Sequence, residues 1–288
     1  MAMIGKILSI PDLRRVRRTK MLAHLSDLHL GRSAEDDAQA EQLARALVEL
    51  RIDHVLVTGD VTHRGRRREW DQFNETFGAR LGSGRLTVIP GNHDRLGDDL
   101  GDVIMPGARV QCATRDGLHL VRVNSTGDHN RSWIAGHGLL LPEDLDAIDA
   151  ALDETPRDHL AVIALHHHVV PLPEEHAAER LSNFLGWRFT AELERGRELL
   201  ERVSGRCGLV LHGHRHVPRG VRVQDGVHAV RIFNAGSSTL LGGARVFEHT
   251  GGVLVGNPWW LEASSLPGRG VSWVATPTVS HDREWRVA

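Results

Sequence analysis

The chain has 288 residues, enough for one large α/β domain with a substantial core or for two small domains. Its formal net charge is −2, so no overall excess of positive charge favours binding to nucleic acid or to a membrane. The two cysteines, Cys112 and Cys207, cannot form a disulfide framework, which favours a reducing, cytoplasmic setting over secretion.

The first twenty residues carry a short apolar segment, Met3–Ile10, followed by basic residues as far as Lys20. A secretory signal places its positive charge before the apolar run, and here the order is reversed. No stretch approaches the roughly 18 apolar residues that a membrane-spanning helix needs. We expect residues 1–20 to form a solvated basic arm, and contact of this arm with anionic lipid at the inner membrane is the alternative.

Short apolar runs typical of strands alternate along the chain with helical patterns. The predicted strands are Met21–Leu25, Val55–Thr58, Leu86–Ile89, Leu118–Val123, Leu160–Leu165, Leu209–Leu211 and Val230–Phe233. The predicted helices are Asp37–Leu50, Glu69–Leu81, Pro142–Leu152 and Phe189–Val203. The alternation predicts α/β layers, and the absence of a low-complexity linker favours a single domain over residues 21–288.

Five of these strands end in residues that suit metal binding. The five ends carry Asp27-Leu28-His29, Gly59-Asp60, Gly91-Asn92-His93-Asp94, His166-His167-His168 and Gly213-His214-Arg215-His216. Because α/β sheets bind ligands at the carboxyl ends of their strands, we expect these side chains to converge. Oxygen and imidazole donors without cysteine suit Mn, Fe or Zn, and the sequence does not choose among them.

The number of donors fits two divalent ions. The candidate ligands are Asp27, His29, Asp60, Asn92, one histidine of the triple, His214 and His216. If Asp60 is shared, each ion receives four protein ligands and keeps open positions for water and substrate. Two such ions can clamp a phosphoryl group and activate a hydroxide.

The order and spacing of these motifs, from about Met21 to Ser238, resemble the calcineurin-like metallophosphoesterase family, in its bacterial dimetal phosphodiesterase branch. The resemblance implies a four-layer α/β/β/α sandwich with the dimetal site at the C-terminal ends of the strands. It assigns the ligands of one ion as Asp27, His29, Asp60 and His216. It assigns those of the other as Asp60, Asn92, His166 and His214.

The resemblance also implies a reaction. A metal-bridging hydroxide would attack phosphorus, while His93 would stabilise the transition state or protonate the leaving oxygen. Asp94 would orient His93, and a purely structural His93 is the rival interpretation. Arg64, Arg95 and His167 are candidate substrate contacts beside the motifs.

The sequence leaves the substrate open. A small phosphodiester such as a cyclic nucleotide is favoured; a lipid-linked phosphodiester or pyrophosphate, or a non-catalytic metal-binding scaffold, is the alternative. A nuclease is disfavoured because no basic patch is interleaved with aromatic residues. An apolar insertion at about 171–190 reads either as a lid over the site or as surface packing.

The last part of the chain, from about residue 241, reads as a C-terminal extension. It contains a predicted loop at 257–261 and a predicted last strand at 271–274. Its tryptophans would pack in the core or form an interface between copies, so a homodimer remains open.

Overall fold

The computed structural model describes residues 18–82, 84–169, 193–225 and 228–264. The first sheet has the order β13-β12-β1-β2-β3, formed by Val253–Glu262, Gly243–Thr250, Lys20–Leu25, His54–Thr58 and Leu86–Ile89. The second has the order β10-β11-β9-β7-β5-β4, formed by Arg219–Asp225, His228–Asn234, Leu209–His212, Leu160–Ala164, Leu118–Val123 and Val110–Arg115. A short pair joins β6 (Gly138–Leu139) to β8 (Leu193–Glu194).

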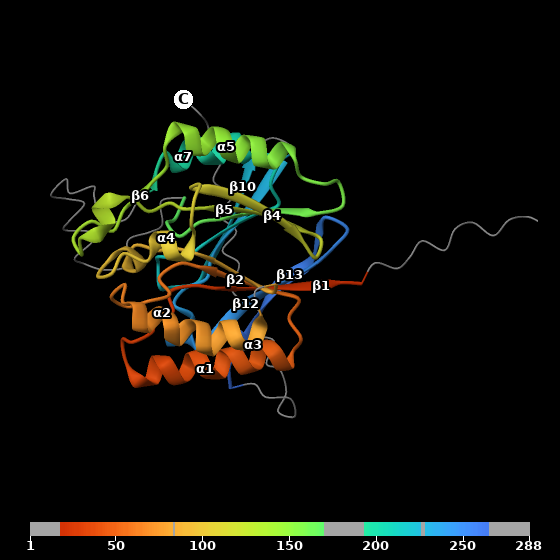
Figure 1. The fold of residues 1–288 in the computed structure, drawn as a ribbon. Helices are drawn as coiled ribbons and strands as arrows, with labels where there is room; N and C mark the ends of the chain where they lie inside the picture. The colour runs from red at the N-terminus through yellow and green to blue at the C-terminus, as the bar shows by residue number, and fades with distance from the viewer. Residues whose placement is uncertain (1–17, 83, 170–192, 226–227, 265–288) are drawn as a thin grey trace, which may run out of the picture.

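Helices cover the outer sides of both sheets (Figure 1). One side carries α1 (Ala34–Glu49), α2 (Arg67–Phe73) and α3 (Ala79–Leu81), and the other carries α5 (Pro142–Asp153) and α7 (Gly196–Val203). The shorter helices are α4 (Gly101–Ile104), α8 (Ser238–Leu241), the π-helix η1 (Asn74–Gly78) and the 3₁₀ turns η2 (His93–Arg95) and η3 (Asp128–Arg131). The chain therefore has the α/β architecture expected from the alternating pattern.

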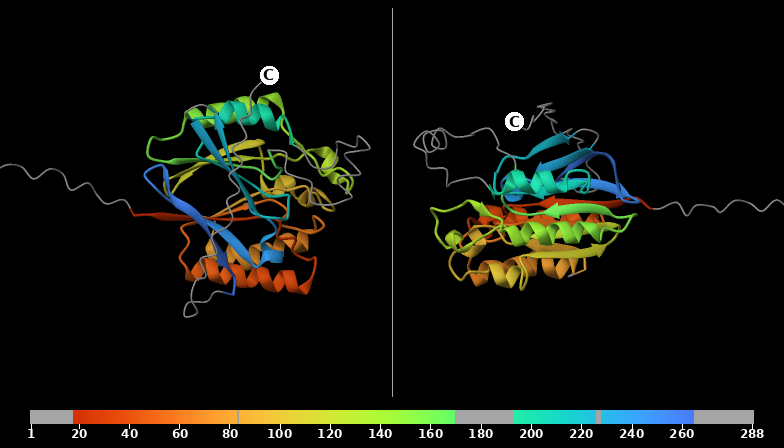
Figure 2. Two further views of the ribbon diagram at one scale, coloured as in Figure 1. Left: turned by 180° about the vertical axis from the view of Figure 1, so that it is seen from behind. Right: turned by 90° about the horizontal axis from the view of Figure 1, so that it is seen from above.

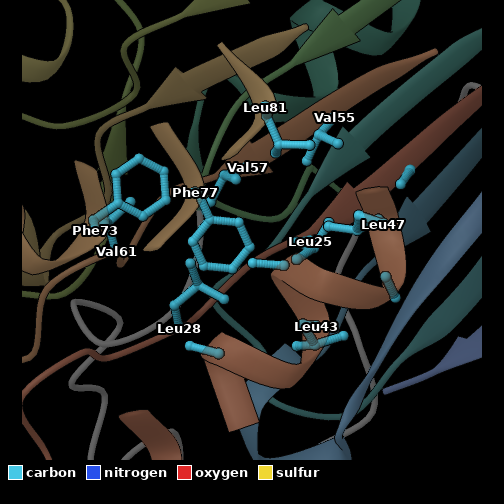
Figure 3. Packing of buried hydrophobic residues seen from close by; sticks show 14 of the residues in the cluster. Leu25, Leu28, Leu43, Leu47, Val55, Val57, Val61, Phe73, Phe77 and Leu81 are labelled. Atoms are coloured by element: carbon cyan, nitrogen blue, oxygen red, sulfur yellow. The ribbon is translucent and has the colours of Figure 1, made fainter. Parts of the chain in front are cut away.

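Buried apolar side chains form three clusters that follow this arrangement. The first packs α1, α2 and η1 on the first sheet, where Phe73 and Phe77 stack with ring centroids 5.2 Å apart (Figure 3). The second lies between the two sheets and includes Leu56 and Val162. The third packs α5 and α7 on the second sheet. Each fully buried Leu, Val or Phe side chain contributes roughly 1.5–3 kcal/mol, so the clusters fix the two sheets as a rigid frame.

Parallel pairing brings the motif-bearing strand ends together. In the first sheet β1, β2 and β3 run parallel, and in the second sheet β7 and β9 run parallel. The strand β12 pairs antiparallel with the other side of β1, and the view from behind in Figure 2 shows β12 and β13 in blue. The residues from about 241, expected as an extension, thus include two strands of the first sheet.

The predicted loop at 257–261 is wrong, because these residues lie in β13. Proline lacks an amide donor, but Pro258 is tolerated since β13 is an edge strand. The register between β12 and β13 shifts between Val246 and Glu248, and Gly256 adopts a φ of +68° on the opposite strand. A bulge therefore absorbs the residues that resemble a loop.

The seven strands predicted between residues 21 and 233 are confirmed, with boundaries that differ by a few residues. The predicted helix over 69–81 is three successive helical segments, since the π-helix η1 separates α2 from α3. Of the predicted helix Phe189–Val203, the described part is helical from Gly196, because Leu193–Glu194 pairs as β8 and Arg195 has a left-handed φ of +65°; residues 189–192 lie outside the described residues. The lid-like insertion, the predicted strand at 271–274 and most of the basic arm lie outside the described residues. In the described part of the chain, no helix has the length and apolar character needed to cross a bilayer.

Candidate metal centre

The loops that follow β1, β2, β3, β7 and β9 meet at one edge of the sandwich. The amide of Asp27 donates to the Gly59 carbonyl at 3.1 Å, which joins the first two loops. The amide of Gly213 donates to the His166 carbonyl at 3.0 Å, which joins the two loops of the second sheet. The amide of His214 donates to Asp27 Oδ2 at 3.0 Å, so a side chain of the first sheet fixes a loop of the second.

Four candidate ligands have a left-handed backbone, which costs a non-glycine residue roughly 1–2 kcal/mol. They are Asp27 (φ 52°), His29 (φ 47°), Asp60 (φ 49°) and His214 (φ 70°). Strain of this kind concentrates at functional sites, where the surrounding structure maintains it. Gly59 also has a positive φ of +93°, and a Cβ there would lie 2.5 Å from His166 Nδ1. The local backbone is thus shaped to bring these side chains close together.

One group of donors consists of Asp27, His29 and His216, whose ligand atoms lie within 4.8 Å of one another. The Nε2 atoms of His29 and His216 face each other at 3.2 Å, and His216 Nε2 lies 3.6 Å from Asp27 Oδ1. Asp27 Oδ1 is buried with no hydrogen-bond partner. An unpaired buried carboxylate oxygen is costly unless a cation accompanies it. This observation fits a metal ion between the three side chains.

A second group forms around His166. Its Nδ1 lies 2.7 Å from the Thr58 carbonyl and donates to it, which leaves the Nε2 lone pair free as a ligand. That Nε2 lies 3.0 Å from Asn92 Oδ1 and 3.4 Å from Asp60 Oδ1. His214 Nδ1 lies 3.0 Å from the same Asn92 oxygen. Carboxylate, amide and imidazole donors therefore converge at a second point.

Asp60 faces both groups. Its Oδ1 lies 3.4 Å from His166 Nε2, and its Oδ2 lies 3.9 Å from His29 Nε2. The carboxylate is almost completely buried, with 2 % of the residue exposed. Because its two oxygens are directed to different donor groups, this carboxylate lies between them.

The electrostatics of the histidines suit metal binding. Burial lowers the pKa of His29 and of His214 well below 6.5, so both rings are neutral at pH 7. The neutral imidazole is the form that binds a metal. Burial also opposes protonation of His166, but the charges of Asp60 and Asp27 raise its pKa to about 9. In the metal-free chain the two carboxylates therefore favour a proton on His166 Nε2, and a bound cation would displace this proton and supply the positive charge in its place.

His93 lies beside the two groups, with its ring centroid 4.5 Å from that of His29. Its Nδ1 donates to the carbonyl of His63 at 2.8 Å, so its Nε2 is free for a proton transfer. Its amide donates to Asp60 Oδ1 at 2.8 Å. A backbone carbonyl and a carboxylate thus fix the position of His93.

The expected orientation of His93 by Asp94 is wrong. The buried Asp94 carboxylate accepts hydrogen bonds from the amides of Gly91 at 2.9 Å, Thr62 at 2.9 Å and Val61 at 3.3 Å, and from the Thr62 hydroxyl at 2.7 Å. These bonds hold the loop after β2 against the loop after β3. Burial and the nearby Asp60 raise the pKa of Asp94 to about 6. Asp94 therefore positions the two loops rather than the ring of its neighbour.

Comparison with known proteins identifies the family. The family model described as calcineurin-like phosphoesterase matches residues 21–218. The chain belongs to the calcineurin-like phosphoesterase family. The resemblance drawn from the sequence motifs is thereby confirmed. No curated protein matches the chain.

Two solved structures support the same fold. The purple acid phosphatase PPD1 from yellow lupin (Lupinus luteus) seeds has a TM-score of 0.57 and 13% identity, and the match covers 86% of this chain and 52% of that one. This chain thus spans about half the length of the lupin protein. A dimetal phosphatase from Danio rerio has a TM-score of 0.56 and 12% identity, with 85% of this chain and 99% of that one covered. At these identities the likeness establishes the fold alone.

The three expected substrate contacts of this calcineurin-like chain occupy different surroundings. Arg64 is exposed and lines a cavity of about 340 Å³. Arg95 is buried and pairs with two carboxylates. Its Nε lies 2.9 Å from Asp99 Oδ1, and its Nη2 lies 3.4 Å from Asp128 Oδ1. This pairing gives Arg95 a structural partner in place of the phosphate contact expected for it.

His167 is buried beside the candidate ligands His166 and His214. Its Nδ1 lies 2.8 Å from the Ser125 hydroxyl, and its Nε2 has no hydrogen-bond partner. The ligand atoms of His166, His167 and His214 lie within 4.8 Å of one another. His167 is therefore close enough to contribute to the second donor group, and burial keeps its pKa well below 6.5.

Sequence reasoning missed His63 and Trp133. His63 belongs to a third group of converging histidines, with His29 and His93. Its place three residues after Asp60, in a motif loop, is a signal that could have identified it. Trp133 lies with its ring centroid 5.1 Å from that of His93, and no motif surrounds it in the sequence.

Proposed function

We propose that the chain hydrolyses phosphodiester bonds of small molecules, such as cyclic nucleotides, at a centre of two divalent ions. Membership of the calcineurin-like phosphoesterase family supports metal-dependent hydrolysis of a phosphoester. The observation that carries the proposal is the Asp60 carboxylate, whose two oxygens face two separate donor groups. A donor set of carboxylate, amide and imidazole suits Mn, Fe or Zn.

The proposed ligands follow the two donor groups. One ion is held by Asp27, His29, Asp60 and His216. The other is held by Asp60, Asn92, His166 and His214. When bound, the two ions supply Lewis-acid stabilisation of the phosphoryl oxygens and an activated water for attack on phosphorus.

The chain's own residues perform the remaining steps. Asp60 and Asp94 hold the loops that carry the ligands in one geometry. The Nδ1 proton of His93 is used by the His63 carbonyl, so Nε2 is the ring nitrogen available to the reacting group. In the proposed reaction His93 acts as the imidazolium, with Nδ1–H on the His63 carbonyl and a second proton on Nε2. The Nε2–H stabilises the negative charge that develops on phosphoryl oxygen, or passes its proton to the leaving alkoxide as the P–O bond breaks, which leaves a neutral ring.

Two further parts of the proposal concern the setting. The free cysteines, of which Cys207 is buried, fit a reducing cytoplasmic compartment. The alternative substrates are lipid-linked phosphodiesters or pyrophosphates, and a non-catalytic scaffold is the remaining alternative. Contact with a membrane would involve the basic arm, residues 1–20. A homodimer would be formed through the tryptophans of the segment from about residue 241.

The test is hydrolysis of bis(p-nitrophenyl) phosphate by metal-stripped protein reloaded with Mn²⁺, Fe²⁺ or Zn²⁺. In Asp60→Asn we expect kcat to fall by about 10³-fold or more, because the metal ions contribute several kcal/mol to transition-state stabilisation. The matched control is Asp98→Asn, which makes the same change at an exposed carboxylate.

Each outcome decides between the alternatives. Metal-dependent turnover that Asp60→Asn abolishes and Asp98→Asn preserves supports the phosphodiesterase. Stoichiometric binding of two ions without turnover of any phosphodiester supports the scaffold. Turnover that Asp60→Asn retains refutes the bridging role of this carboxylate.

A further inference from the structure

Two side chains beside His93 have no role in the proposed reaction. The rings of His63 and His93 stack at 25°, with centroids 5.8 Å apart. The indole of Trp133 meets the His93 ring edge-on at 89°, with centroids 5.1 Å apart, and lies 6.0 Å from His63. His63 comes from the loop after β2 and Trp133 from the segment after η3. Two segments distant in sequence therefore place aromatic rings on the same side of His93.

The turn that carries Trp133 is held by a buried side chain. Asn130, with 1 % of its surface exposed, donates from Nδ2 to the Ala135 carbonyl at 2.7 Å and the His137 carbonyl at 3.1 Å. Its Oδ1 accepts from the amide of Gly127 at 2.8 Å. The Asn130 side chain thus joins the two ends of the turn, and its hydrogen bonds fix the backbone that carries Trp133.

Ion pairs attach this segment to η2, the turn that contains His93, and to Asp99, which follows it. Arg95 pairs with Asp128 at 3.4 Å, and Arg131 pairs with Asp99 at 2.7 Å. A single exposed ion pair contributes little to stability. Here each of the two segments supplies one arginine and one aspartate, so the two pairs together hold the segments against each other. The position of Trp133 is therefore linked to the position of His93.

An open cavity lies against this indole. It has a volume of about 340 Å³ and is lined by Arg64, Arg66, Leu96, Gly97 and Trp133. Trp133 is 61% exposed, although a large aromatic surface usually is removed from water. The cavity combines an indole face with two guanidinium groups, of which Arg66 already pairs with Asp98 at 3.4 Å. This combination suits a planar group that carries negative charge.

We propose that this cavity, named the Trp133 pocket and defined by its five lining residues, receives the part of the phosphoester that carries the leaving oxygen, where that part contains a planar ring and a further anionic group. The proposal rests on the proposed function, because His93 faces the leaving oxygen and Trp133 lies beside His93. The indole stacks on the ring, and Arg64 binds the additional charge. Nucleotide-type phosphoesters have this chemistry.

The first test measures binding by isothermal titration calorimetry to full-length, Mn²⁺-loaded protein. The probes are AMP, which has a planar base, and glycerol phosphate, which has none. We expect Trp133→Ala to weaken AMP binding by roughly 5- to 100-fold, the range for loss of base–aromatic stacking, and to change glycerol phosphate binding less than about twofold. Trp133→Phe should restore most of the AMP affinity.

A matched control is Ile134→Ala, since Ile134 is the neighbouring residue and is 85% exposed. It should bind AMP like the wild-type chain. Equal losses for AMP and glycerol phosphate, an unchanged AMP affinity in Trp133→Ala, or no AMP binding by the wild-type chain at millimolar concentration would overturn the proposal.

The second test concerns the charge. ADP carries more negative charge than AMP, so the wild-type chain should bind ADP more tightly, and Arg64→Gln should remove this difference. An ADP preference that persists in Arg64→Gln refutes the role of Arg64. Because these titrations need no turnover, they can succeed where the phosphodiesterase test fails, and the two failures are distinguishable.

Discussion

Acid should destabilise the protein through His54, a buried histidine at the start of β2, remote from the metal centre. Its Nε2 lies 2.9 Å from the Thr87 hydroxyl, and 3 % of the residue is exposed. Burial is the main cause that lowers its pKa, from 6.5 to about 4; Asp116 opposes this effect and Arg115 adds to it. The folded chain therefore disfavours the protonated ring, which the unfolded chain accepts.

Proton linkage sets the sign and the size of the effect of His54 on the free energy of unfolding. Above pH 6.5 the ring is neutral in both states and has no effect on the free energy of unfolding. As the pH falls from 6.5 towards 4, only the unfolded state binds a proton, so stability is lost over this window and the loss stops below the folded pKa. At about 1.4 kcal/mol for each pH unit, the loss is about 2 kcal/mol at pH 5 and about 3 kcal/mol when complete.

The assay is urea denaturation of the metal-free chain, followed by circular dichroism at pH 7.5, 6, 5 and 4.5. His54→Gln should lose about 2 kcal/mol less than the wild-type chain between pH 7.5 and pH 5. Thr87→Val is the control, because it removes the hydrogen-bond partner without removing the titrating group, and its curve should keep the pH dependence. Parallel curves for His54→Gln and the wild-type chain would refute the reasoning.

Two further predictions concern the backbone at the site and a buried cation. Gly59→Ala should lower the free energy of unfolding by roughly 2–5 kcal/mol, since left-handed strain and a clash with His166 add together. Gly107→Ala, at a φ of +89° with nothing within 4 Å of the added Cβ, should show only the strain, and equal losses in urea denaturation would contradict the clash. Arg245→Met should be neutral or stabilising, by up to about 4 kcal/mol, because the Arg245 Nε and Nη2 are buried without a partner and burial lowers its pKa to about 10. A fall in melting temperature in Arg245→Met would instead indicate that its contacts with the rings of Phe233 and Trp260 outweigh the burial of charge.

The parts of the fold predicted from the sequence are those in which one local pattern is sufficient. A short apolar, β-branched run such as Leu86–Ile89 forms a largely buried strand even at the edge of its sheet, so the local pattern is sufficient to predict it. Strands β4 and β12 were missed because their identity depends on a neighbour. The edge strand β4 (Val110–Arg115) is mostly exposed and has no apolar run, while β12 ends in no motif.

The candidate site also contains some features that a local sequence pattern predicts and others that depend on the fold. Residues brought together by parallel strand ends, such as Asp27 and Asp60, could be expected to converge. The partners of Asp94 could not be predicted in this way. Its position next to His93 in the sequence suggests that ring as the partner, but in the fold its carboxylate accepts hydrogen bonds from the amides of the loop after β2. Trp133 reaches His93 only through a turn closed by Asn130 and through ion pairs between loops. No spacing rule contains that information.

The position of β1 between β2 and β12 determines when the first strand can complete its pairing during synthesis and folding. Lys20 is paired with His249, so the first strand acquires its second neighbour only when β12 has been synthesised. The loop after β1 also depends on late residues, because the Ser237 hydroxyl donates to the Asp27 carbonyl at 2.8 Å and the Ser238 amide donates to the Ser26 carbonyl at 3.0 Å. Contacts between such distant segments form slowly and late in folding. On a ribosome, the loop that carries Asp27 therefore attains this geometry only after residues 237–249 have been synthesised.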